Sequence, residues 1–162
     1  MQGPFHAVTM KYCLPLLAFT LLLSCKGAAN PELLKGTEWL CVDTVDPADE
    51  GKLKYPDKSN PPEDAFREVY SEDGHYLVFD MASGESLLGE GVAKARYILE
   101  KSEKGDLVLS VDLFVEDGKW TSQEERIPYI IKELTESNFH SVADELDYGE
   151  RYFNESKCVR LN

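Results

Sequence analysis

The sequence predicts an all-β domain of about eight antiparallel strands that run up and down and close into a barrel. Apolar and polar residues alternate with a period of two along much of the chain, and short turn signals that contain glycine separate these runs. No segment keeps a helical period over three turns. Closing the sheet would remove the exposed edges of an open meander. The alternative that fits the same pattern is a β-sandwich.

Four strands are expected in the first half of the chain, near 37–44, 65–71, 75–81 and 90–102. Residues 75–81 are aromatic and aliphatic with a period of two. In the fourth strand, Ala93, Ala95, Tyr97 and Leu99 alternate with Lys94, Arg96, Ile98 and Glu100. Glycine-containing turns at 72–74 and 82–84 separate the runs. Residues 45–64 hold four prolines and many charges, so we expect a long loop, of a kind that is often functional or mobile.

Four more strands are expected near 106–116, 120–134, 138–147 and 151–161. The first is the clearest, because every second residue from Leu107 to Val115 is apolar. In the second, residues 127–134 are apolar and β-branched, and Pro128 indicates an edge or a bulge. Residues 142–146 also fit a short helix, which is the alternative for that segment.

The composition limits the class of partner. The 162 residues suit one domain, and 43% hydrophobic with 29% charged residues is a globular composition. Seventeen Lys and Arg residues face 30 Asp and Glu residues, which gives a net charge of −13. Such a chain is repelled by phosphate backbones and by anionic lipid headgroups. We therefore expect no nucleic-acid partner and no basic patch that docks on a membrane.

The first 24 residues are predicted to be a signal peptide that is removed. Residues 13–24 form an uncharged run of twelve that follows Lys11. A membrane-spanning helix needs about 20 apolar residues, so this run suits a secretory leader better. The sequence allows translation to start at Met1 or at Met10.

The leader ends in Leu22-Leu23-Ser24-Cys25, which resembles the bacterial lipobox. The resemblance implies that Cys25 receives a lipid and becomes the new N-terminus, with 25–32 as a tether and 33–162 as the folded domain. It also implies a protein held by lipid in the bacterial cell envelope, at the outer membrane on its periplasmic or surface face. The alternative is an ordinary signal peptide that contains a cysteine.

Two cysteines, Cys41 and Cys158, remain near the ends of the domain. Export would place them in an oxidising compartment, and the first and last strands of a closed barrel are neighbours. We consider both a disulfide between them and two separate buried thiols. Neither belongs to a Cys-x-x-Cys pair, and His75 and His140 have no neighbours at ligand spacing, so no metal and no cofactor are expected.

The start of the domain, residues 33–39 (LLKGTEW), resembles the opening of the lipocalin-like domains found in lipoproteins of the Bacteroidetes, and residues 158–161 (CVRL) resemble their last strand. Two residues separate Gly36 from Trp39, where true lipocalins have one. The resemblance implies an antiparallel barrel. It also implies that Trp39 plugs the closed end and that Arg160 covers this ring through a cation–π contact.

The sequence contains no Gly-x-Ser-x-Gly elbow, His-Glu-x-x-His pair or phosphate-binding glycine loop, so we do not expect an enzyme. The barrel interior is the remaining candidate site, either packed with side chains or hollow enough for one small ligand. The residues expected to line it are Phe79, Ala93, Ala95, Tyr97, Tyr129 and Phe139.

Three functions follow as hypotheses. The first is a lipid-anchored binding protein for a small apolar ligand or a partner protein. The second is a structural or inhibitory interaction module that uses the acidic loop after the first strand as its contact surface. The third and least favoured is a hydrolase of the cell envelope.

Overall fold

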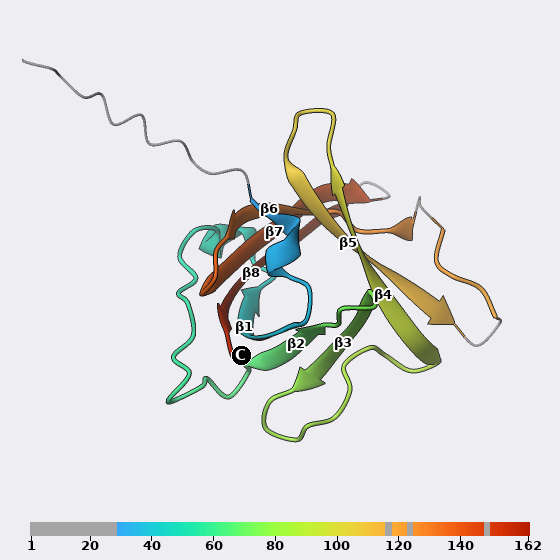
Figure 1. The fold of residues 1–162 in the computed structure, drawn as a ribbon. Coiled ribbons are helices and arrows are strands. Elements are labelled where there is room, and N and C mark those ends of the chain that lie inside the picture. The colour runs from blue at the N-terminus through green and yellow to red at the C-terminus, as the bar shows by residue number, and fades with distance from the viewer. Residues whose placement is uncertain (1–28, 116–117, 123–124, 148–149) are drawn as a thin grey trace, which may run out of the picture.

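Eight antiparallel strands form a closed barrel in the part of the chain that the structure, a computed structural model, describes: residues 29–115, 118–122, 125–147 and 150–162 (Figure 1). Each strand pairs with the next in sequence, and the last pairs with the first. The predicted fold class, an up-and-down barrel of the lipocalin-like kind, is therefore confirmed. The strands are β1 (Thr37–Thr44), β2 (Phe66–Tyr70), β3 (His75–Asp80), β4 (Val92–Lys101), β5 (Leu107–Val115), β6 (Tyr129–Leu134), β7 (Asn138–Asp147) and β8 (Glu150–Arg160), with two short 3-10 helices, η1 (Pro31–Leu33) and η2 (Pro47–Asp49).

The strand predicted over 120–134 was wrong in its first half, because β6 begins only at Tyr129. Trp120 and Thr121 turn back onto β5 instead: Trp120 forms a bridge with Phe114, and the Thr121 amide donates to the Leu113 carbonyl at 2.9 Å. Pro128 lies directly before β6 and has no N–H to donate, which suits the start of a strand. Residues 142–146 belong to β7 and are not helical.

One end of the barrel is filled by aromatic side chains. Trp39, Tyr70 and Phe139 are almost completely buried, and both Trp39 and Tyr70 meet Phe139 edge to face, at centroid distances of 5.8 and 6.2 Å. Leu34, just after η1, is fully buried against the same cluster. We call this end the closed end; η1 lies across it (Figure 1).

A disulfide joins the first and last strands. Cys41 and Cys158 lie directly opposite each other in the β1–β8 ladder, and both are fully buried inside the barrel. They are 117 residues apart in sequence, so the bond closes almost the whole domain into one covalent loop.

The long loop between β1 and β2 packs against the outside of the barrel. The Gly51 amide donates to Glu155 at 2.7 Å, Lys157 donates to the Leu53 carbonyl at 2.8 Å, and the Tyr55 hydroxyl donates to Glu133 at 2.7 Å. Beneath the loop lie outward-facing apolar side chains, and this second cluster comprises Leu40, Val42, Ala65, Leu53 and Val159. The loop therefore covers apolar surface that the alternating pattern of β1 would otherwise expose to water.

The barrel wall has two short seams, one on each side of the β4–β5 hairpin. Among the described residues, β3 and β4 pair at His75–Arg96 and Tyr76–Ala95, and β5 and β6 pair at Val108–Ile130 and Leu109–Tyr129. Beyond these pairs, towards the end opposite the closed one, residues 85–87 and 119–121 fold back onto β3 and β5. The strands diverge there and leave the barrel open at that end, which we call the mouth.

We predict that removing the disulfide lowers stability. The double variant Cys41→Ala/Cys158→Ala should lose about 2–5 kcal/mol in free energy of unfolding, because the unfolded chain regains the entropy of a long open loop. Urea denaturation of both proteins measures this loss. Adding reductant should destabilise the wild type and leave the variant unchanged, and equal stability of the two proteins without reductant would contradict the prediction.

Candidate ligand-binding pocket

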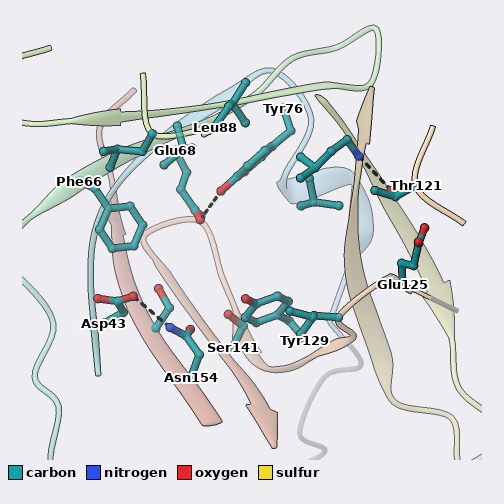
Figure 2. A pocket seen from close by; sticks show the side chains of 16 residues that line it. Asp43, Phe66, Glu68, Tyr76, Leu88, Thr121, Glu125, Tyr129, Ser141 and Asn154 are labelled. Carbon is teal, nitrogen blue, oxygen red and sulfur yellow. Dashed lines mark hydrogen bonds between the residues drawn. The ribbon is translucent and has the colours of Figure 1, made fainter. Parts of the chain in front are cut away.

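A pocket of about 360 Å³ occupies the barrel interior between the aromatic closed end and the mouth (Figure 2). Most of its lining comes from strand positions that face inward, with the loops after β3 and β5 completing the rim. Sixteen described residues line it: Asp43, Phe66, Glu68, Tyr76, Val78, Leu87, Leu88, Val111, Leu113, Thr121, Glu125, Ile127, Tyr129, Ser141, Asn154 and Ser156.

The wall of the pocket towards β2, β3 and β5 is largely apolar. Phe66, Val78, Val111 and Leu113 alternate on these strands with residues that face outward. At the rim, Leu87 is 50% exposed and Ile127 is 37% exposed. Apolar surface therefore continues from the interior to solvent, which gives an apolar molecule a favourable path of entry.

A carboxyl group projects into the pocket from β2. Glu68 accepts hydrogen bonds from the hydroxyls of Tyr70 and Tyr76, both at 2.8 Å (Figure 2 shows the bond from Tyr76). Burial inside the barrel raises the pKa of Glu68, the two tyrosine hydrogen bonds lower it in part, and the nearby negative charge of Asp43 raises it further. The site thus holds a carboxyl whose charged form is poorly solvated.

Further polar groups of the pocket come from β1, β6 and β8. The Asn154 amide donates to Asp43 at 3.0 Å, and the hydroxyls of Tyr129 and Tyr152 lie 3.0 Å apart. Burial raises the pKa of Tyr129, so this phenol stays protonated at neutral pH. An apolar chamber with a few converging polar groups is the usual form of a small-molecule site.

Of the residues predicted to line the interior, Tyr129 lines the pocket. Ala95, Tyr97 and Phe139 belong to or pack against the core cluster that contains the aromatic closed end, outside the pocket lining. Phe79 lies on the outer face, where the Arg67 guanidinium sits 4.8 Å above its ring, because Tyr76 and Val78 take the inward positions of β3. Ala93 is exposed, at a register shift in the β4–β5 ladder.

The closed end differs in part from the expected plug. Trp39 is completely buried there, and its indole N–H donates to the Thr37 hydroxyl at 2.7 Å. Arg160 lies opposite Trp39 in the β1–β8 register, but its guanidinium donates to the carbonyl of Asn162. Within the described part of the chain, the cation–π contacts involve cations other than Arg160 and rings other than Trp39, so the predicted contact between these two residues was wrong. The Phe139 ring packs on Trp39 instead.

A buried ion-pair cluster on the outside of the barrel holds the rim of the mouth. Asp112 is completely buried between Arg96, at 2.7 Å, and Arg126, and Arg96 also lies 4.3 Å from the centroid of the Trp120 ring. These contacts tie the segment after β5 to the β4–β5 hairpin. They hold Thr121, Glu125 and Ile127 beside the pocket.

The described residues contain a single group of three potential metal ligands, formed by Cys41, Glu68 and Cys158. Its two sulfurs are bonded to each other in the disulfide, so they are not thiolate ligands. His75 pairs with Asp73 at 2.9 Å at the surface, and His140 pairs with Glu155 at 2.9 Å.

The predicted signal peptide, the predicted lipidation site Cys25 and the predicted tether residues 26–28 lie outside the described residues. In the described part of the chain, every helix is too short or too polar to cross a membrane. No family model matches the chain, and no curated protein sequence matches it significantly. The functional argument therefore depends on the pocket and on the sequence.

We predict that Glu68→Gln changes how stability depends on pH. Because the pKa of Glu68 is raised above 4.5 in the folded protein, the folded state binds this proton more tightly than the unfolded state. The contribution of Glu68 to the free energy of unfolding should therefore fall as pH rises from 4.5 through the folded pKa, and Gln should remove this fall. Urea denaturation at pH 4.5, 6 and 8 should show that the free energy of unfolding of the variant increases relative to that of the wild type as pH rises. A constant difference across this range would contradict the prediction.

Proposed function

We propose that this protein is a lipid-anchored protein of the bacterial cell envelope whose barrel binds a small apolar molecule. The observation that supports this most strongly is the pocket of about 360 Å³ with apolar walls and an apolar rim. Ligand pockets have volumes of about 300–1,000 Å³, and barrels of eight strands are wide enough to hold one small ligand.

The open interior also favours binding over the two other hypotheses. A purely structural or inhibitory module would need no chamber, and the acidic loop that could serve as its contact surface is tied to the barrel through Gly51, Leu53 and Tyr55. For a hydrolase, the described lining offers carboxyl, phenol and hydroxyl groups, but the hydroxyls of Thr121 and Ser156 bond to backbone groups and to a cysteine sulfur, not to a base.

The placement of the chain's N-terminal part suits exchange of a ligand with solvent. Ala29, Leu33 and Leu34 pack at the closed end of the barrel. A lipid on Cys25, four residues before Ala29, would therefore attach the domain to the membrane by its closed end. The mouth would face away from the lipid surface, towards the aqueous compartment.

Ligand binding can be tested with the neutral fluorescent probe N-phenyl-1-naphthylamine. We expect saturable enhancement of its fluorescence at one probe per chain. Val111→Trp should weaken binding at least about tenfold, because the larger ring fills the pocket. The matched control Leu77→Trp places the same ring on the exposed outer face of β3 and should leave the affinity unchanged. Absence of saturable binding to the wild type, or equal loss in both variants, would contradict the proposal.

Lipid anchoring can be tested by fractionating bacterial cells that express the full chain. Cys25→Ala should move the protein from the membrane to the soluble fraction, because each lost acyl chain removes about 0.8 kcal/mol per buried methylene. Cys13→Ala, within the same leader, is the matched control and should stay with the membrane. Retention of Cys25→Ala in the membrane fraction would refute the anchor.

A further inference from the structure

We propose that the pocket selects ligands that carry a positively charged, ammonium-type group on an apolar body. This inference rests on the proposed binding function and adds the chemical class of the ligand. The carrying observation is the charge of the lining: the sixteen described lining residues include Asp43, Glu68 and Glu125, and none of them is Lys, Arg or His.

Two of these carboxyl groups face the same part of the pocket: Asp43, which is exposed to solvent, and Glu68, which is partly buried. Asp43 and Glu68 come from the adjacent strands β1 and β2, and Figure 2 shows both side chains directed into the same space, which the Tyr129 ring also borders. Asp43 uses one oxygen to accept a bond from Asn154, and Glu68 accepts one bond on each oxygen. A carboxylate has about four acceptor positions, so both groups can accept further N–H donors.

The cations on the same strands point away from the pocket. Arg67, next to Glu68, lies over Phe79 on the outer face and also contacts Glu38 at 3.3 Å. Arg96 is paired with Asp112, and Lys157 is paired with Glu155 and the outer loop. These three positive groups therefore lie outside the described pocket lining, and a cationic ligand group would be the counter-charge for Asp43 and Glu68.

The rest of the lining fits an organic cation better than a metal ion. Phe66, Tyr76 and Tyr129 place aromatic rings beside the carboxyl groups, and such rings attract ammonium groups through their faces. The apolar wall would bury the body of the ligand. An anionic amphiphile such as a fatty acid would bring a like charge to two acidic groups, which specific binding sites use to exclude the wrong ligand.

The test is competition against N-phenyl-1-naphthylamine by three ten-carbon compounds that differ only in the head group: decylamine, decanol and decanoate. The full-length wild-type protein is used at pH 7.5 and low salt, with each compound below its micelle concentration. We expect decylamine to compete at least about tenfold more strongly than decanol, and decanoate to compete least.

The double variant Asp43→Asn/Glu68→Gln should lose the preference for decylamine over decanol, with each compound's competition measured relative to that variant's own affinity for the probe. Glu100→Gln/Glu103→Gln removes the same charge from exposed positions outside the pocket and should keep the preference. If the first double variant does not fold, as judged by its circular dichroism, Asp43→Asn alone is expected to reduce the preference severalfold.

The outcomes separate the two proposals. Failure of the wild type to bind the neutral probe overturns the binding function and the ligand class together. If the probe binds but decanoate or decanol competes as well as decylamine, the binding function stands and the ligand class is wrong. An unchanged preference in the folded pocket variants also overturns the ligand class.

Discussion

The pairing of the first strand with the last is the constraint on which the rest of this structure depends. β1 and β8 lie at opposite ends of the domain sequence, and their ladder turns an open meander into a barrel with an inside and an outside. Cys41 and Cys158 make that pairing covalent. Without it, the inward residues of β1 and β8, Asp43 and Asn154 among them, would not face a chamber, and the outer loop would have no continuous surface to cover.

The barrel is divided into two parts with different physical roles. At the closed end, Trp39, Tyr70 and Phe139 supply the apolar burial that stabilises the fold. Towards the mouth, the strands diverge and Glu68 occupies an inward position, which costs stability because its charged form is desolvated. Such a cost in stability is typical of functional sites, because optimal packing alone would not place a desolvated carboxyl group there.

Much of this arrangement could be predicted from the sequence. The alternating residues of β5 and the glycine turns fix most strands, because a half-buried strand has a strict period of two. The same period places Glu68 inward between Phe66 and Tyr70, so the alternation of this strand already indicates a carboxyl group inside the barrel. The ion pair between Asp112 and Arg126 could not be found in this way, since it joins a strand to a loop by tertiary packing. Nor could the register shift between Val92 and Lys94 in the β4–β5 ladder, where Ala93 is exposed.

The two short seams give the wall an uneven mechanical character. β7 and β8 are paired along their whole length, and the disulfide links β8 to β1. In contrast, the β4–β5 hairpin is joined to each neighbouring strand by two residue pairs among the described residues. Local opening takes place first where the fewest backbone hydrogen bonds must break. The β4–β5 hairpin is therefore the most easily displaced part of the barrel wall, and its outward movement would let the interior accommodate molecules of different width.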